Sequence, residues 1–384
     1  MSKALFIGLM SGTSLDGVDA ALVEFLDDPE TPAQKNPEQI VSQHCKVLHT
    51  FNFPYSSALR SELLALHDSG NNELERGALI ANQLSTLYAQ AVNQLLSMAG
   101  ITPSQVSAIG CHGQTIRHRP ELGFTLQIGN SSLLAELTGI TVIGDFRSRD
   151  IAAGGQGAPL VPAFHQAVFG HPTLNRVLIN IGGIANLSYL PANGEIRGFD
   201  SGPGNMLMDV WAERHLGKRY DESGNWAASG QVIPDLLERL LAETFFAQVP
   251  PKSTGRDLFS LSWLEQYLES HYQPADVQRT LLELTAASIA DAVRQYCQSD
   301  AAGMPDEIYL CGGGAYNSAL FQCLQLLLQP VNIYMSDALG ISVSWVEATA
   351  FAWLAKQTLH RLPGNLPAVT GAKGPRILGA VYAY

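Results

Sequence analysis

Apolar stretches that end in glycine-rich turns predict an α/β protein. Residues 4–10 and 18–25 have the composition of buried strands, and a Gly/Ser/Thr turn separates them. The same unit recurs at 175–182 and 185–190 around Gly183. This repetition of a strand, a tight glycine turn and a returning strand predicts two α/β lobes that open in the same way.

Apolar positions spaced three to four residues apart predict the helices. The stripe in 73–98 is the clearest, and Gly100 is its expected stop. A surface loop is expected over 27–38 and an irregular stretch over 144–162, because both are rich in residues that break regular structure. The remaining expected strands are 39–51, 105–110, 124–128, 140–144 and 307–311, and the remaining helices are 204–216, 231–243, 261–270, 278–298, one from about 317, and 342–358.

The irregular stretch 144–162 combines glycine and proline with charged side chains, which suits a site or a crossing between lobes. We therefore predict a first lobe over 1–143 and a second lobe over 144–384. The first lobe holds the first glycine turn and the second lobe holds the others. Whether the C-terminal tail returns to the first lobe is left open.

Composition and charge narrow the classes of partner. The chain has 384 residues and is 46% hydrophobic, which is enough apolar material for a folded core. Its formal charge of −12 repels phosphate backbones and anionic lipid, so we expect neither nucleic acid nor a membrane as the main partner. In addition, the longest apolar runs fall far short of the roughly 18 residues that a membrane helix needs.

The five cysteines indicate a reducing compartment. Their number is odd and none forms a CxxC pair, so we expect free thiols in the cytoplasm rather than disulfides or a zinc site. The oligomeric state does not follow from the sequence, and a homodimer is left open.

Three glycine clusters are candidates for binding phosphate. They lie at Ser11–Gly17, Gly182–Gly183 and Gly312–Gly314, each at the end of an apolar strand. Glycine lets backbone N–H groups approach a phosphate closely, and Ser and Thr hydroxyls add donors. Tight hairpins also require glycine, so a single cluster has a purely structural explanation. All three together favour a nucleotide site, although neither a P-loop nor a GxGxxG motif is present.

This arrangement resembles the actin/hexokinase/Hsp70 nucleotide-binding superfamily. Within it, the chain resembles the family of anhydro-N-acetylmuramic acid kinases over essentially its whole length. The stretches that carry the resemblance are 8–19, 110–115, 144–147 with Asp150, 154–159, 180–186, 199–205, 252–256, and 340–341 with Glu347.

The resemblance implies an α/β fold of two actin-like ATPase (ribonuclease H-like) lobes with a nucleotide cleft between them. It implies ATP-dependent phosphorylation of 1,6-anhydro-N-acetylmuramic acid at O6 with hydrolytic opening of the anhydro ring. The products would be N-acetylmuramic acid 6-phosphate and ADP, in peptidoglycan recycling, with Mg²⁺ as the metal. The implied ATP-binding residues are Gly12, Thr13, Ser14, Leu15, Asp16, Gly17, Val18, Asp19, Gly182, Gly183, Gly312, Gly313 and Gly314.

The expected Mg²⁺ ligands are less clear. Most sugar kinases of the superfamily carry Asp two residues before the Gly-Thr of the first hairpin, and this chain has Met10 there. Asp16 or Asp19 can take its place, so the metal ligands are left unassigned.

Asp200 is the candidate general base. It ends an apparent strand and opens the turn Ser201–Gly204, which would fix a carboxylate on rigid backbone. An ordinary N-cap for a helix starting near Asn205 explains the same pattern. The residues alone do not distinguish a general base from an N-cap, whereas the resemblance favours the general base.

Five further residues are candidates for binding the sugar. His112 and Gln114 follow a strand end in a glycine-flanked turn and suit polar contacts to a sugar, although such a His is often structural. Arg147 could pair with the lactyl carboxylate of a muramic sugar, or only bridge to Asp150. Glu347 lies in a mostly apolar helix and could reach a sugar hydroxyl or face solvent.

Two other classes of function stay open. Another actin-like-fold sugar kinase or a non-catalytic ATPase module would share the lobes without this chemistry. A plain glycosidase would use Asp200 with Glu347, and the three glycine clusters would then have no purpose.

Overall fold

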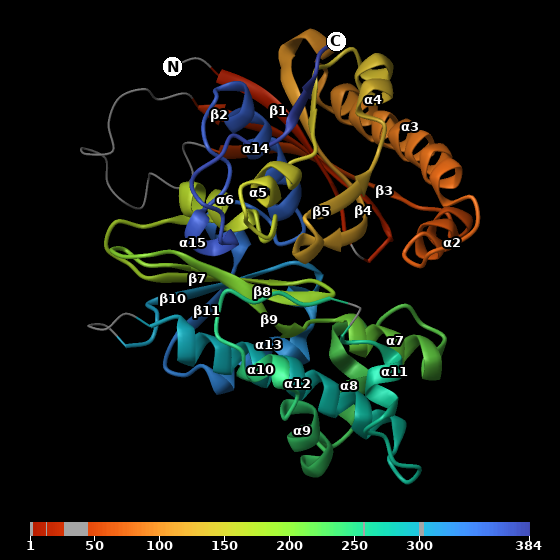
Figure 1. The fold of residues 1–384 in the computed structure, drawn as a ribbon. Helices are drawn as coiled ribbons and strands as arrows, with labels where there is room; N and C mark the ends of the chain where they lie inside the picture. The colour runs from red at the N-terminus through yellow and green to blue at the C-terminus, as the bar shows by residue number, and fades with distance from the viewer. Residues whose placement is uncertain (1–2, 13, 27–44, 256–257, 299–302) are drawn as a thin grey trace. The chain divides into compact units, whose positions relative to one another are not determined.

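The structure is a computed structural model that describes residues 3–12, 14–26, 45–255, 258–298 and 303–384 (Figure 1). The chain divides into two compact units. Unit 1 comprises Met1–Phe169, Leu339–Ile341 and Trp345–Tyr384, and unit 2 comprises Gly170–Ala338 and Ser342–Ser344. The expected loop 27–38 and the start of the expected strand 39–51 lie outside the described residues.

The division differs from the expected boundary after residue 143. Residues 144–169 belong to unit 1, together with the C-terminal segment. The reason is pairing between segments far apart in the sequence: β12 (Ala380–Tyr382) pairs with β6 (Val142–Gly144), and α14 (Val346–Leu359) packs against α6 (Val161–Phe169). Local patterns in the sequence carry no signal for such contacts.

Unit 1 is built on a mixed sheet with the strand order β12-β6-β4-β1-β2-β3, and β5 pairs with β4. Strands β1, β2 and β3 are antiparallel neighbours, and β4 and β6 continue the sheet on the other side of β1, parallel to it. The additional bounds are β1 Lys3–Ser11, β2 Gly17–Leu26, β3 Cys45–Pro54, β4 Val106–Arg119 and β5 Phe124–Ile128.

Unit 2 repeats this plan with the order β11-β10-β7-β8-β9. Here β7, β8 and β9 are antiparallel neighbours, and β10 and β11 run parallel to β7. Each unit therefore has the 3-2-1-4-5 core of a ribonuclease H-like lobe, which confirms the expected fold class. The bounds are β7 Arg176–Ile181, β8 Ile184–Leu190, β9 Arg197–Pro203, β10 Glu307–Cys311 and β11 Asn332–Met335.

The long helix expected in unit 1 is confirmed as α3 (Glu73–Ala99), with Gly100 in the left-handed conformation at its end. Helices α2 (Ser57–Ala65) and α4 (Ser131–Thr138) were not expected, because their apolar stripes are short. The stretch 144–162 is not wholly irregular, since it contains α5 (Ser148–Ala152) and the start of α6. The last short helix, α15, spans Pro367–Thr370.

Two glycines allow α14 to lie directly on the first sheet. Gly8 in β1 and Gly110 in β4 are register partners. A Cβ at Gly8 would lie 1.8 Å from the carbonyl oxygen of Ala348, and one at Gly110 would lie 2.0 Å from that of Phe351. Larger residues would push α14 away from the sheet, so these glycines fix the helix that carries Glu347.

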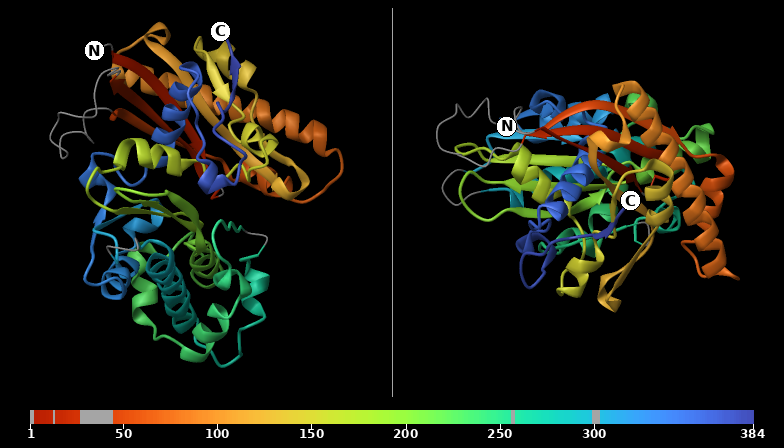
Figure 2. Two further views of the ribbon diagram at one scale, coloured as in Figure 1. Left: turned by 60° about the vertical axis from the view of Figure 1, so that its left-hand side comes forward. Right: turned by 90° about the horizontal axis from the view of Figure 1, so that it is seen from above.

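The main helix of unit 2 is α12 (Pro274–Tyr296), which lies against β8 and β9 on one face of the second sheet (Figures 1 and 2). Its core residues have helical spacing and are almost fully buried. The other helices of unit 2 are α7 Met206–Leu216, α8 Asn225–Ser229, α9 Pro234–Leu241, α10 Thr244–Ala247, α11 Leu261–Glu265 and α13 Ser318–Leu327.

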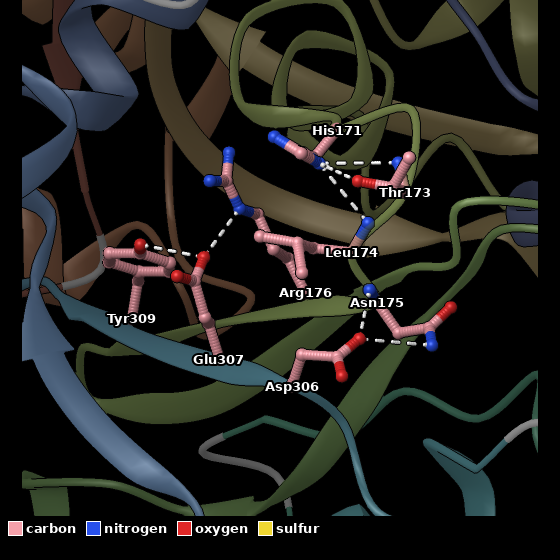
Figure 3. A network of polar contacts seen from close by, with 8 residues as sticks. All are labelled: His171, Thr173, Leu174, Asn175, Arg176, Asp306, Glu307 and Tyr309. Atoms are coloured by element: carbon pink, nitrogen blue, oxygen red, sulfur yellow. Dashed lines mark hydrogen bonds and ion pairs between the residues drawn. The ribbon is translucent and has the colours of Figure 1, made fainter. Parts of the chain in front are cut away.

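A polar network joins the beginnings of β7 and β10 (Figure 3). The backbone N–H and the side-chain amide of Asn175 both donate to Asp306, at 2.7 and 3.1 Å. Arg176 Nε and the Tyr309 hydroxyl donate to the same oxygen of Glu307, at 2.8 and 2.9 Å. The network lies at the opposite end of β7 from its glycine turn, and we assign it to holding the strands in register.

Two further expectations concern cysteines and membranes. All five cysteines are buried and free of disulfides. None of the helices in the described ranges combines the length and the apolar composition needed to span a bilayer.

Candidate functional site

The first glycine turn joins β1 to β2 in unit 1. Its accessible positions are Ser14 and Asp16, which are exposed, and Gly12 and Asp19, which are half-buried. The hydroxyl of Ser14 donates to Asp16 at 2.7 Å. The turn thus presents two carboxylates and a hydroxyl to a ligand. The other expected ATP-binding residues Leu15, Gly17 and Val18 are buried and shape the turn, while Thr13 lies outside the described residues.

Asp19 has an unusual carboxyl group. Burial raises its pKa to about 6; the hydrogen bond from Asn52 opposes this rise, and the charge of Asp16 adds to it. Two carboxylates that repel each other beside a candidate phosphate-binding turn suit a divalent cation. The described residues include no group of three or more His, Cys, Asp or Glu that could hold a metal. Mg²⁺ is commonly held by one or two carboxylates together with substrate phosphates, and Asp16 and Asp19 fit that pattern.

Gln114 braces the first turn from β4. It is fully buried, its Nε2 donates to the carbonyl oxygen of Gly12 at 3.1 Å, and its Oε1 accepts a hydrogen bond from the Ser11 hydroxyl. The Ser11 hydroxyl also contacts the hydroxyl of Tyr55 at 2.8 Å. The amide is therefore occupied by the protein, although sequence reasoning placed it on the sugar.

His112 connects the same turn to Arg147. Its Nδ1 lies 3.1 Å from the carbonyl oxygen of Ser11, and its Nε2 accepts from Arg147 Nε and Nη2 at 3.2 and 2.9 Å. Burial, and secondly the charge of Arg147, lowers the pKa of His112 to about 3, so the ring is neutral and can accept from Arg147. Both ring nitrogens are thus used within the protein.

Arg147 is held in one orientation beside Glu347. Besides its bonds to His112, its Nη1 donates to the carbonyl oxygen of Gly157 at 2.8 Å. Burial lowers the pKa of Arg147 to about 10, and the charges of Glu347 and Asp150 oppose that shift. The guanidinium stays charged at neutral pH, and both Arg147 and Glu347 are half-buried residues. Unit 1 therefore brings a cation and a carboxylate close together on two half-buried residues.

Asp150 is completely buried, which separates it from the half-buried pair. Its Oδ1 accepts from Asn365 and Thr370 at 2.6 and 2.8 Å, and its Oδ2 accepts from the N–H of Gly157 at 2.8 Å. These bonds tie the loop behind Arg147 to the C-terminal segment. They leave the carboxylate little capacity for a further ligand.

In unit 2 the second glycine turn is held by the beginning of α7. The N–H groups of Gly204 and Met206 donate to the carbonyl oxygen of Gly183, at 2.9 and 3.2 Å. The N–H of Asn205 donates to that of Gly182 at 2.8 Å. The carbonyl oxygens of the turn are therefore bonded within the protein, and the N–H of Gly182 donates to the carbonyl oxygen of Ile184 at 3.2 Å.

The third cluster follows β10 and leads into a short 3₁₀ turn and α13, as expected. Gly312 has a φ of +79°, and a Cβ there would lie 2.8 Å from the carbonyl oxygen of Ile181. Its N–H donates to Val343 at 2.9 Å. Gly312 is therefore required by both its backbone conformation and its close approach to β7. Gly313 has open space around it, whereas a Cβ at Gly314 would lie 2.3 Å from the side chain of Ile181.

Asp200 lies within β9 rather than at its end. The strand continues to Pro203, and the helix that follows has Asn205 as its N-cap residue, so the expected turn and the N-cap alternative are both wrong. The backbone N–H of Asp200 donates to the carbonyl oxygen of Lys252 at 3.1 Å. Its Oδ2 accepts from the N–H of Thr254 at 2.9 Å.

The surroundings of the Asp200 carboxyl bring its pKa close to neutrality. Burial raises its pKa to about 7, although the Thr254 hydrogen bond and the charge of Lys252 act in the opposite direction. The carboxyl is enclosed by protein while the residue keeps some accessible surface. A carboxylate of this kind can accept a proton from a bound water. Sequence reasoning missed the contribution of Thr254, because a backbone donor from a distant loop leaves no signal in the sequence.

The comparisons with solved structures return distant matches. The activator of the 2-hydroxyisocaproyl-CoA dehydratase from Clostridium difficile with bound ADPNP is 14% identical, covers 93% of this chain and 98% of its own, and has a TM-score of 0.43. A ROK family glucokinase from Streptomyces griseus in complex with glucose and AMPPNP is also 14% identical, covers 92% of this chain and 100% of its own, and has a TM-score of 0.41.

The comparisons with sequences return close matches. The family model described as anhydro-N-acetylmuramic acid kinase matches residues 4–384. A protein of that name from Nitrosospira multiformis is 54% identical over 384 residues and covers all of both chains. One from Nitrosomonas europaea is 54% identical over 379 residues, which is 98% of this chain and 99% of its own. The chain therefore belongs to the anhydro-N-acetylmuramic acid kinase family.

Proposed function

We propose that the protein phosphorylates 1,6-anhydro-N-acetylmuramic acid with ATP while water opens the anhydro ring. The products are N-acetylmuramic acid 6-phosphate and ADP, and the reaction serves peptidoglycan recycling. Family membership over the whole chain supports the kinase activity and its substrate. The observation that carries the chemistry is the Asp200 carboxyl, whose pKa of about 7 suits a general base.

In this mechanism Asp200 accepts a proton from water, and the water oxygen bonds to the anomeric carbon of the sugar. The bond between that carbon and the bridging oxygen breaks. The bridging oxygen remains on C6 and takes the γ-phosphoryl group, and ADP leaves. A single carboxylate suffices, because the departing oxygen transfers to phosphorus and needs no general acid.

The glycine turns supply the nucleotide site of the proposal. Backbone N–H groups at Gly12, Gly183 and Gly313 bind the phosphate oxygens. Mg²⁺ neutralises charge on the transferring phosphoryl group when it is bound. Asp16 and Asp19 would hold it from unit 1, since they are the carboxylates of the first turn and of the start of β2.

Arg147 and Glu347 are the proposed contacts to the sugar. A charged guanidinium suits the lactyl carboxylate, and a carboxylate accepts hydrogen bonds from sugar hydroxyls. His112, Gln114 and Asp150 act as positioning residues, because their polar atoms are occupied within unit 1. A cytoplasmic location accords with the free thiols and with the use of ATP.

The experiment that tests the proposal mixes the protein with the anhydro sugar, ATP and Mg²⁺ and identifies the product by mass spectrometry. We expect a phosphorylated, ring-opened sugar that forms only when ATP is present. Ring opening at the full rate without nucleotide would favour a glycosidase. ATP hydrolysis that ignores the sugar would favour an ATPase module.

A further inference from the structure

Arg147 uses three of its N–H donors within unit 1. Its Nε and Nη2 donate to Nε2 of His112 at 3.2 and 2.9 Å, and its Nη1 donates to the carbonyl oxygen of Gly157 at 2.8 Å. A guanidinium has five N–H donors. Counting the bonds made in the part of the chain that the structure describes, one N–H is left on each of the two Nη nitrogens. Two donors on neighbouring nitrogens match the two oxygens of a carboxylate.

His112 supports one side of the guanidinium from the first sheet. The residue lies in β4, and its ring contacts that of Phe351 in α14, with ring centroids 4.8 Å apart. Because α14 packs against β4, this support belongs to the core of unit 1. The other support is of a different kind.

Gly157 supports the other side from the loop that follows α5. Its φ is +68°, and a Cβ there would lie 3.2 Å from the carbonyl oxygen of Arg147, so the loop requires glycine at this position. Its carbonyl oxygen accepts from Arg147, while its N–H donates to Oδ2 of Asp150 at 2.8 Å. The position of this carbonyl oxygen therefore depends on the carboxylate of Asp150.

The segment 365–373, which includes α15, anchors that carboxylate from the other end of the chain (Figure 1). Asn365 and Thr370 are 4% and 1% exposed, and both donate to Oδ1 of Asp150, at 2.6 and 2.8 Å. The N–H of Gln156 also donates to the carbonyl oxygen of Thr370 at 2.8 Å. The segment is thus bonded both to the loop and to the carboxylate behind it.

The charge of this anchor reaches Arg147 as well. Burying a carboxylate is costly because it loses water, and a neutral side chain would join two segments at lower cost. The charges of Glu347 and Asp150 oppose the lowering of the pKa of Arg147 by burial. The buried carboxylate therefore supports both the placement of the guanidinium and its charged form.

We propose that the segment 365–373, through Asn365 and Thr370, sets the orientation in which Arg147 meets the carboxylate of the sugar. Asp150 and Gly157 transmit the position of the segment to the guanidinium. Asn365 and Thr370 are positioning residues, because they act through other residues and do not touch the sugar. The inference rests on the proposed function, in which Arg147 contacts the lactyl group.

The test begins with Thr370→Val, which keeps the shape of the side chain and removes the hydroxyl that donates to Asp150. At saturating ATP and Mg²⁺, the KM for 1,6-anhydro-N-acetylmuramic acid should rise at least threefold. The kcat and the KM for ATP should stay within twofold of the wild type, because Arg147 binds a group remote from the reacting atoms. Thr370→Ser retains a hydroxyl and should restore the KM for the sugar.

The matched control is Thr358→Val. The Thr358 hydroxyl is also buried in unit 1, and it donates to the carbonyl oxygens of Leu354 and Leu378, at 2.9 and 2.6 Å. This bond likewise holds the C-terminal part of the chain, but it has no link to Asp150. Thr358→Val is therefore expected to leave the KM for the sugar within twofold of the wild type, even where thermal unfolding shows a loss of stability.

A double-mutant cycle with Arg147→Met tests whether Thr370 acts through Arg147. Thr370→Val should lower kcat/KM for the sugar at least threefold in the wild type and less than twofold in the Arg147→Met variant. Should either variant not fold, Asn365→Ala, which removes the other donor to the same oxygen, or Arg147→Lys takes its place with the same expectations.

Three results would contradict the inference. A folded Thr370→Val that raises the KM for the sugar less than threefold, or a fall in kcat/KM of twofold or more in the absence of Arg147, would overturn it alone. An unchanged KM for the sugar in Arg147→Met would remove the proposed sugar contact and the inference with it. A wild-type protein that does not phosphorylate the anhydro sugar would overturn the proposed function itself.

Discussion

The carboxyl of Asp200 is poised between its two protonation states at neutral pH. Burial is the largest influence on its pKa and raises it to about 7, against the hydrogen bond from Thr254 and the charge of Lys252. A base with this pKa is ionised often enough to act and basic enough to take a proton. If Asp200 is the base, as proposed, its protonation should set how the rate depends on pH.

The pH profile is the first prediction. Below a pKa of about 7 the base is protonated, so kcat/KM for the sugar should fall about tenfold per pH unit as the pH drops from 7 to 5. It should level off above pH 7. Initial rates at saturating ATP and Mg²⁺ measure this. A profile that is flat from pH 5 to 8 would contradict the assignment.

The second prediction concerns Asp200→Asn. The rate should fall by about 10²-fold or more, with ATP affinity almost unchanged. The ordinary pKa of an aspartate is 3.8, and the folded state raises that of Asp200 to about 7. Between pH 3.8 and about 7 the folded state therefore holds a proton that the unfolded state has lost, so this carboxyl lowers the stability of the wild type as the pH rises through that range. The variant should therefore be at least as stable as the wild type at pH 8. Near-normal turnover of the variant counts against the base. So does a difference in unfolding temperature between the variant and the wild type that is less favourable to the variant at pH 8 than at pH 4.

The third prediction concerns the metal. Asp19→Asn should raise the Mg²⁺ concentration for half-maximal ATP binding at least tenfold, because it removes the more buried of two carboxylates that suit the cation. Asp16→Asn, at an exposed position, should have a smaller effect and serves as the comparison. Titration of ATP binding with Mg²⁺ measures both, and an unchanged requirement in Asp19→Asn would exclude this site.

The sequence indicates which side chains could bind a substrate or transfer a proton. It does not show how many of their hydrogen bonds are already made within the protein. Arg147 and Asp150 were expected together, yet Arg147 is half-buried, whereas Asp150 is fully buried and saturated by Asn365, Thr370 and Gly157. Gln114 likewise turned out to brace the first turn. Such partners come from distant segments, and no local pattern records them.

At the scale of elements, the glycine turns and the strands that flank them were well predicted. Strand–turn–strand units have strong local signals in apolar composition and in glycine. The end of β9 was misjudged, because Ser201, Gly202 and Pro203 resemble a turn, although Gly202 and Pro203 pair with β8 and Ser201 lies at a register shift in β9. Tertiary pairing overrides such local preferences.

The fourth prediction tests the first turn as an element. Among the described residues, a Cβ at Gly12 would approach Met10 and Ser14 most closely, both at 3.9 Å, so Gly12→Val should fold normally. Its side chain should block phosphate approach and raise the apparent KM for ATP at least tenfold. Steady-state kinetics and thermal unfolding measure the two effects.

Gly110→Ala provides the contrasting control for Gly12→Val. Its Cβ would lie 2.0 Å from the carbonyl oxygen of Phe351, so it should destabilise unit 1 by roughly 1–3 kcal/mol or more. If Gly12→Val left the KM for ATP unchanged in a folded protein, the turn would not belong to the nucleotide site.

At the scale of the whole molecule, the chain uses one strand order twice, and each unit contributes different chemistry. Unit 1 holds the carboxylates suited to Mg²⁺ and the pair Arg147 and Glu347, whereas unit 2 holds Asp200 and two glycine clusters. The duplication was visible in the sequence, but the boundary was not, because the C-terminal segment completes the first sheet through β12. The nucleotide cleft expected between the lobes stays a prediction.

The central claim is that water attacks the anomeric carbon while the phosphoryl group moves to O6. It is tested most directly by running the reaction in ¹⁸O-labelled water with ATP, Mg²⁺ and the anhydro sugar. The product is analysed by mass spectrometry early, before the anomeric oxygen exchanges with solvent. We predict one labelled oxygen at C1, none in the phosphoryl group, and phosphate on O6. Label in the phosphoryl group, or labelled and unphosphorylated sugar formed without ATP, would contradict the account.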